Sequence, residues 1–259
     1  MIPVIPQDKK RIFILSPGRS GSSLLAALLS DAGATFPNES ETSWNPLGGA
    51  FESDAVGKAA FLYAQAHEIQ ASKGYSPLYR LFHKKIVTYK RAAAKKKVGK
   101  LMKTATCFKE TANLHYLPRV AAFLGYWPVI VLNYRDFPEW MGSMFPGQRH
   151  LPVEALARNY LSTMENSIAV LGLFGGCVVN YRDLMDPGAD QWAHILSEVT
   201  GLSREVLLNS RSNRFGDPGP ESPLPVRMAQ AEEIMALARG YEGMIVPPAP
   251  SAVKRWLVP

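Results

Sequence analysis

Cysteine is scarce in this sequence, and the residue patterns of disulfide frameworks and metal sites are missing. The 259 residues include only Cys107 and Cys177, and both lie in apolar runs. We therefore expect buried, reduced thiols rather than a disulfide. The five histidines form no H-x-x-x-H or Cys/His ligand spacing, which excludes the common zinc motifs, so no metal is expected.

Long apolar runs are also missing. Stretches such as 121–133 and 168–179 are shorter than the ~20 residues that a membrane span needs. The amino terminus has no charged leader ahead of an apolar segment. We therefore expect a soluble, cytoplasmic protein. The chain is 47% hydrophobic and long enough for one sizeable core, so residues 1–259 are expected to form a single domain.

Acidic residues are outnumbered, and the formal net charge is +7. This balance indicates an anionic partner: a nucleic acid, a phospholipid surface, an acidic glycan or a multiply phosphorylated cofactor. The densest basic stretch, 83–103, carries nine Lys or Arg residues and no acid. This cluster of basic residues is explained equally well by a helix face exposed to solvent and by a binding function. The functional interpretations are an acidic acceptor or contact with a membrane surface.

Four short apolar runs have the length of strands, at 12–16, 104–109, 128–134 and 176–181. Their apolarity is continuous, which indicates strands covered on both faces of a parallel sheet. Helical patterning occurs at 22–32, 55–72, 78–102, 138–145, 152–173, 188–200 and 226–240. The predicted fold is therefore α/β, a three-layer sandwich with a mostly parallel central sheet. The Pro- and Gly-rich stretch 212–225 predicts a loop.

A Gly/Ser turn, SPGRSGSSLL, joins the first predicted strand to the first predicted helix. Such a turn at the carboxyl end of a strand is where open parallel sheets bind phosphate, because backbone N–H groups at the helix start have no partner within the helix. A nucleotide-triphosphate loop would have Lys after its last Gly, and here a Ser follows, which argues against a kinase or ATPase. The candidate anion donors are Arg19, Ser20, Gly21, Ser22 and Ser23.

Three stretches together resemble the sulfotransferases that use 3′-phosphoadenosine 5′-phosphosulfate (PAPS). SPGRSGSSLL is similar to the family's 5′-phosphosulfate loop, commonly P-R-S-G-[ST]-[ST]-L-L. VIVLNYRDFPEWMGSM, residues 129–144, resembles the second signature, with an Arg at a strand end and a Ser eight positions later. CVVNYRDLMDP, residues 177–187, resembles the family's late strand followed by Y-E-D-L. The three occur in the family's order.

The resemblance implies a P-loop-like strand, loop and helix that binds PAPS, with adenosine 3′,5′-bisphosphate (PAP) as the product of the reaction. It implies that Arg135 and Ser143 hold the 3′-phosphate and that Tyr181 lies beside the adenine. Arg214 is the candidate from a late basic loop, although the family's R-K-G form is absent. The alternative for Arg135 is a surface ion pair with Asp136 or another acid, and for Tyr181 it is core packing.

The stretch FKETANLHYLP, residues 108–118, is similar to the family's segment after the second strand, and Lys109 matches its lysine. The family's catalytic His would fall on Thr111, which cannot act as a base at neutral pH. Glu110 is the adjacent carboxylate, and His115 lies about one helical turn further on. We favour Glu110 as general base over His115, and expect an electrostatic role for Lys109. A helix-capping Glu and a structural His are the alternatives.

The resemblance implies transfer of a sulfuryl group to an acceptor hydroxyl of a carbohydrate, glycolipid or small natural product. Trp44, Trp140 and Phe145 are the aromatic candidates for the acceptor wall. A non-catalytic anion- or nucleotide-binding protein and a degenerate P-loop kinase are the alternative functions. A basic RNA-binding module is supported by charge alone, so no nucleic acid partner is expected.

Overall fold

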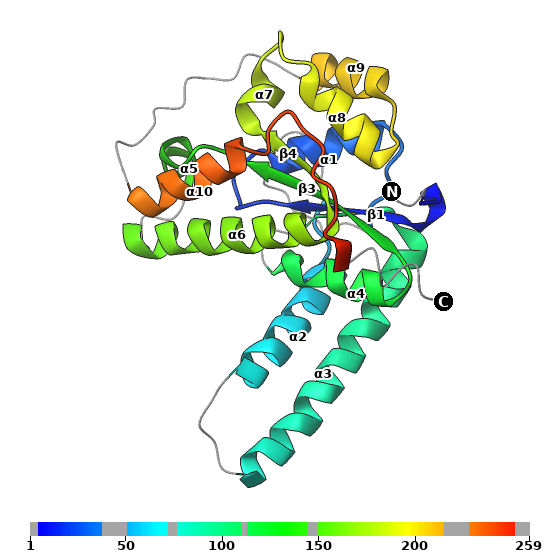
Figure 1. Ribbon diagram of the computed structural model, residues 1–259, viewed down its shortest axis with the longest axis vertical. Helices are drawn as coiled ribbons and strands as arrows, with labels where there is room; N and C mark the ends of the chain where they lie inside the picture. Colours follow the sequence, from blue (N-terminus) through cyan, green and yellow to red (C-terminus); the bar gives the residue numbers. More distant parts are fainter. Residues whose placement is uncertain are drawn as a thin grey trace.

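A four-stranded, all-parallel sheet lies at the centre of the computed structural model, which describes residues 5–37, 51–71, 77–109, 113–144, 150–214 and 228–251. The strand order is β2-β1-β3-β4 (Figure 1). All four predicted strands are confirmed, because each is an apolar run buried on both faces. The strands are β1 (Lys10–Leu15), β2 (Cys107–Lys109), β3 (Trp127–Tyr134) and β4 (Gly176–Asn180).

Helices cover both faces of the sheet, which gives the predicted three layers. On one face, strand residues such as Ile12, Ile14 and Val131 pack in one apolar cluster with the first set of helices. That set is α1 (Ser22–Asp31), α8 (Gln191–Thr200) and α9 (Arg204–Arg214). Cys107 and Cys177 are free and buried in this cluster, as predicted.

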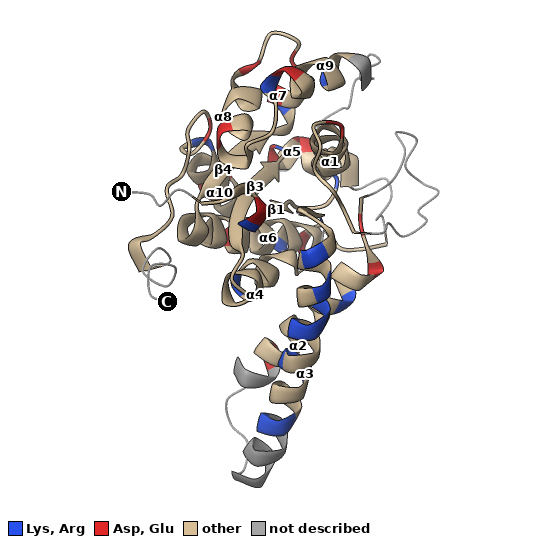
Figure 2. Cartoon of the chain, turned by 90° about the vertical axis from the view of Figure 1, so that its right-hand side faces the viewer, with Lys and Arg blue, Asp and Glu red and all other residues tan. Residues whose placement is uncertain are grey.

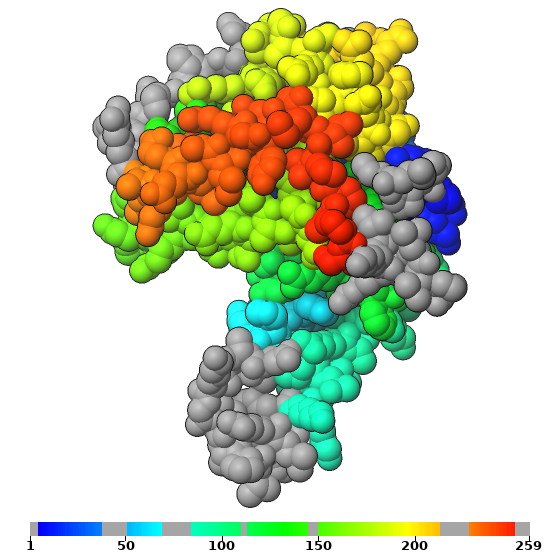
Figure 3. Space-filling model, viewed as in Figure 1, coloured from blue at the N-terminus to red at the C-terminus, as the bar shows by residue number. Residues whose placement is uncertain are grey.

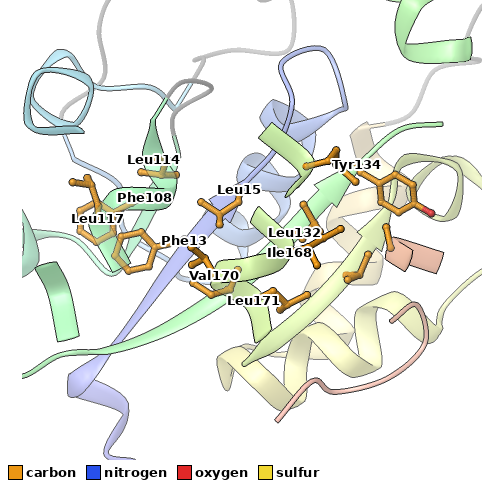
Figure 4. Packing of buried hydrophobic residues seen from close by; sticks show 14 of the residues in the cluster. Phe13, Leu15, Phe108, Leu114, Leu117, Leu132, Tyr134, Ile168, Val170 and Leu171 are labelled. Carbon is orange, nitrogen blue, oxygen red and sulfur yellow. The ribbon is translucent and has the colours of Figure 1, made fainter. Parts of the chain in front are cut away.

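The opposite face carries the larger cluster. Phe13 of β1 stacks on Phe108 of β2 with ring centroids 5.3 Å apart, and Leu132 of β3 packs nearby with residues of α6 (Figure 4). The helices that contribute to this cluster include α4 (Leu117–Phe123), α5 (Phe137–Met144), α6 (Val153–Phe174) and α10 (Ala229–Arg239). Alternate residues of each strand therefore anchor opposite layers.

Two long helices, α2 (Asp54–Ala71) and α3 (Pro77–Thr104), pack against each other as a hairpin that extends away from the body of the molecule (Figures 1 and 3). Buried Ala59, Ala60, Ala94 and Val98 lie in these helices. Small residues at such positions allow close approach of two helices. No helix of the described residues is long and apolar enough to cross a bilayer.

The order of the strands creates a reversal of direction at the centre of the sheet. From β1 the chain crosses to β2 on one side, then returns past β1 to β3 and β4 on the other. In open parallel sheets, a crevice forms at such a switch point, outside the carboxyl ends of the two central strands. The segments that follow β1 and β3 therefore border this crevice.

All seven predicted helices are present, with ends shifted by up to three residues. The prediction missed α4, α9, the short α7 (Tyr181–Met185) and the 3₁₀ turns η1 (Gln7–Lys9) and η2 (Leu114–Tyr116). The predicted loop at 212–225 was wrong for its first three residues, because α9 continues to Arg214. Residues 215–225 lie outside the described residues.

Candidate functional site

The loop after β1 has an unusual backbone. Gly21 lies at φ +79° and is the N-cap of α1, and Arg19 lies at φ +66°, a left-handed conformation that is uncommon for a residue with a side chain. The Gly21 cap provides no side-chain hydrogen bond to the first turn of α1. Backbone N–H groups at this helix start are therefore available to an anion.

Ser20 gives a second, independent sign of a ligand. Its side chain is fully buried, and its Oγ has no hydrogen-bond partner among the described residues. Buried hydroxyls in folded proteins nearly always have a partner. Arg19, next to it in the loop, is exposed to solvent, whereas Ser22 is buried. The loop thus combines a solvent-facing cation with a buried donor that lacks an acceptor.

Lys109, at the end of β2, is joined to this loop. Its side chain is only 1% exposed, and its Nζ donates to Ser23 Oγ at 3.0 Å and to Glu52 Oε1 at 2.8 Å. The sequence identified Lys109 but missed its partner Glu52. The available signal was that a buried ammonium requires an acidic partner. Glu110 lies outside the described residues.

Arg135 directly follows β3 and is 6% exposed. Its guanidinium carbon lies 4.2 Å from the centroid of the Tyr181 ring, and its Nε lies 3.7 Å from Glu139 Oε2. The alternative of a surface ion pair with Asp136 or another acid holds in part: the acid is Glu139, and Arg135 is buried rather than at the surface. Asp136 is instead paired with two other arginines, Arg182 at 3.2 Å and Arg239 at 3.0 Å.

The ring of Tyr181 connects the two central loops. Tyr181 is the first residue of α7 rather than the last of β4, and a Cβ placed on Gly21 would lie 2.3 Å from its Cδ2. The backbone of the first loop therefore packs directly against the ring on which Arg135 stacks. Segments after β1, β3 and β4 thus meet at one aromatic side chain.

Trp140 strengthens the same junction. Its indole Nε1 donates to Gly18 O at 2.5 Å, and its ring is fully buried beside Phe137 and Tyr160. Trp140 was a candidate for the acceptor wall, but its burial fits the commoner role of a large apolar ring in the core. Ser143 is half-buried on α5, one helical turn after Glu139 and on the same side of that helix.

The side chains of three further predicted residues lie outside the described part of the chain. Arg214 ends α9, but its side chain lies outside the described residues, as do Trp44 and Phe145. Arg211, one turn earlier in α9, is buried and donates to three backbone carbonyls between 186 and 189. It therefore holds that loop in place.

A polar cavity of about 230 Å³ begins at Ser16, the first residue after β1. One wall is η2 with His115, and another is a polar stripe of α6 at helical spacing. Burial, with the nearby charges of Arg119 and His67, lowers the pKa of His115 from 6.5 to about 4. His115 is therefore neutral at pH 7 and has a nitrogen that can accept a proton. The α6 stripe consists of Asn159, Ser162, Thr163 and Asn166.

Asn113, which also lines this cavity, is in the left-handed conformation with φ +60°. Outliers of this kind gather at ligand sites, where the surrounding structure maintains them. No family model matches the chain, and no curated protein matches its sequence. Within the described residues, no cluster of three or more His, Cys, Asp or Glu could hold a metal ion.

Proposed function

We propose that this chain transfers a sulfuryl group from PAPS to the hydroxyl of a small acceptor. The observation that carries the proposal is the junction at Tyr181. The Gly/Ser loop after β1 and a buried arginine after β3 contact the same ring, at the switch point of a parallel sheet. A nucleotide with phosphates at both ends of its ribose requires two cationic sites flanking one aromatic surface.

The residues fit such a donor. The loop from Arg19 to Ser23 would hold the 5′-phosphosulfate through backbone N–H groups, with the buried Ser20 hydroxyl gaining the acceptor it lacks. Arg135 and Ser143 would hold the 3′-phosphate, and Tyr181 would flank the base. The phosphate would replace Glu139 as the partner of Arg135. Glu139 would keep Arg182, which already donates to it at 2.8 Å.

The polar cavity is the proposed acceptor site because Ser16, at the base of the loop, lines it. Amides, hydroxyls and one imidazole line it, and none of its described lining residues carries a charge at neutral pH. This lining favours a neutral, hydroxyl-rich acceptor such as a carbohydrate over an acidic one. The cationic stretch of α3 contributes no residue to the described lining.

In the reaction, the acceptor oxygen forms a bond to sulfur as the bond from sulfur to the bridging phosphate oxygen breaks. PAP leaves with that electron pair, and the acceptor proton passes to a base. His115 is the base candidate that lines the cavity, while Glu110 is retained as the candidate expected from the sequence. Lys109, bonded to Ser23, would stabilise negative charge on the transferred group electrostatically.

Calorimetry with PAP, ADP and ATP tests the proposal. We expect preference for PAP, and a loss of about tenfold to a hundredfold in affinity in Arg19→Ala and in Arg135→Ala, since each removes a charge-assisted hydrogen bond. Arg204→Ala, at an exposed arginine paired with Asp190, should leave affinity unchanged. Equal or tighter ATP binding would favour the kinase alternative. Tight PAP binding with no sulfation of any carbohydrate would favour a non-catalytic binding protein.

A further inference from the structure

A second hollow, an apolar groove of about 940 Å³, lies between α3, α4 and the end of α6. The groove and the junction at Tyr181 lie at opposite edges of the sheet. Phe123 ends α4 just before β3 begins, and Phe174 ends α6 just before β4 begins. Both strands are parallel, so the groove lies at the amino edge of the sheet, opposite the carboxyl edge that carries the proposed reaction.

The groove combines an apolar surface with cations at its rim. Val120, Leu173 and Phe174 line it, and Phe123 stands at its border with 73% of its surface exposed. The charged residues among its described lining are all basic: Arg91, Lys95 and Arg119. Lys95 Nζ lies 4.2 Å from the centroid of the Phe123 ring. A positively charged apolar groove is complementary to an anionic amphiphile.

The cationic surface continues along α3. Lys85, Lys96, Lys100 and Lys103 are exposed and recur at helical spacing on one side of the helix, together with Tyr89, which is 74% exposed. This side adjoins the groove, because Ala92 and Lys95 line the groove from neighbouring positions of the same helix. Figure 2 shows Lys and Arg along the coloured part of α3. The helix contains no Asp or Glu.

We propose that this surface docks on a membrane containing anionic phospholipid. The lysine side of α3 would lie against the headgroups, Tyr89 and Phe123 would enter the interface, and the groove would take an acyl chain whose headgroup meets Arg91, Lys95 and Arg119. Exposed aromatic residues beside lysines, together with a large apolar groove, favour lipid over nucleic acid. An acyl chain can fill an apolar groove, whereas the charged backbone of a nucleic acid cannot. The proposal does not depend on the sulfotransferase activity.

Cosedimentation of the full chain with vesicles tests the proposal. We expect binding to vesicles containing phosphatidylglycerol, none to phosphatidylcholine alone, and weakening as salt is added. The triple variant Lys95→Gln, Lys96→Gln, Lys100→Gln should bind on the order of a hundredfold more weakly. The matched control Lys58→Gln, Arg158→Gln, Arg204→Gln removes the same charge from exposed positions elsewhere and should bind as the parent does.

The apolar part needs separate variants. Phe123→Ser should reduce vesicle binding severalfold at high salt as well as low salt, with little effect on thermal unfolding because the ring is exposed. Ala122→Glu, which places a carboxylate in the groove, should also weaken binding. Equal losses in the control triple variant, binding that ignores lipid charge, or tighter binding to a labelled single-stranded oligonucleotide than to vesicles would each overturn the proposal.

Discussion

Gly21 is the residue where both the backbone conformation and a close contact exclude a side chain. Its φ of +79° disfavours any side chain, and a Cβ would lie 2.3 Å from the Tyr181 ring. We expect Gly21→Ala to lower the free energy of unfolding by about 2 kcal/mol and to weaken PAP binding, because loop and ring must separate. Urea unfolding and calorimetry measure the two effects.

Gly33→Ala is the matched control for this prediction. Gly33 follows α1 at φ +100°, but a Cβ there would meet nothing within 4 Å. The Gly33→Ala variant should lose only about 1 kcal/mol of unfolding free energy, from the unfavourable backbone conformation, and its PAP affinity should be unchanged. If both substitutions weakened PAP binding equally, the contact between Gly21 and Tyr181 would not be part of the binding site.

His115 gives the protein a pH dependence whose sign can be derived. Its folded pKa of about 4 lies below the usual 6.5, so the unfolded chain binds more protons between these values. Its contribution to stability is therefore complete above about pH 6.5 and is lost as pH falls toward 4. After allowance for partial exposure, we expect His115→Gln to remove about 1 kcal/mol of this dependence, measured by urea unfolding across pH. An unchanged dependence would contradict the assigned burial.

The sequence alone identifies functional residues that belong to a local motif. It misses contacts between residues that are distant in the sequence and are brought together by the fold. Arg19, Ser20 and Arg135 follow strands, so their place at the carboxyl edge could be inferred. The pairing of Lys109 with Glu52 could not, since it depends on how a distant segment returns to β2. The pairing of Arg135 with Glu139, and of Asp136 with Arg182 and Arg239, likewise depends on where the fold places α7 and α10.

At the scale of elements, the ion pair of Lys109 and Glu52 fastens the start of α2 to the end of β2. Lys109→Met should cost about 2–3 kcal/mol of unfolding free energy, because it leaves a largely buried carboxylate without its ammonium. Combining it with Glu52→Gln should recover part of that loss. A double-mutant cycle by urea unfolding should yield a coupling of about 1–3 kcal/mol. Additive losses would mean that the pair contributes nothing as a pair.

Glu139, in the first turn of α5, opposes an anion at Arg135. Its carboxylate lies 3.7 Å from the Arg135 Nε and also accepts from Arg182. We expect Glu139→Gln to tighten PAP binding by roughly threefold to tenfold, since the ligand no longer displaces a negative charge. Glu154→Gln, in the first turn of α6, is the control with the same charge change and should have no effect. Weaker binding in Glu139→Gln would place Glu139 as a positioning residue for Arg135.

Helices and strands could be predicted where an apolar segment of the sequence is also buried in the fold. The four strands are continuous apolar runs and the sheet buries both of their faces, so their type and order along the chain followed from the sequence. Helix α9, with the sequence REVLLNSRSNR, has few apolar residues and is followed by a Pro- and Gly-rich stretch, which concealed it. Its burial against α1 and α8 is a tertiary effect. The one-turn α7 depends on a cap by Asn180 that no periodicity reveals.

For the whole molecule, the proposed donor would link β1 and β3, the two central strands of the sheet. A ligand bound only by the folded state stabilises it by about 2.7 kcal/mol at a hundred times its Kd. For a chain of this size, that corresponds to a rise in Tm of roughly 5–10 °C. We expect PAP to produce this rise in a thermal scan of the parent protein. Arg19→Ala and Arg135→Ala should each reduce it at the same PAP concentration, because the site draws on both strand ends. A rise that survives Arg135→Ala but not Arg19→Ala would mean that the loop after β1 binds phosphate by itself, and that the two strand ends do not share one ligand.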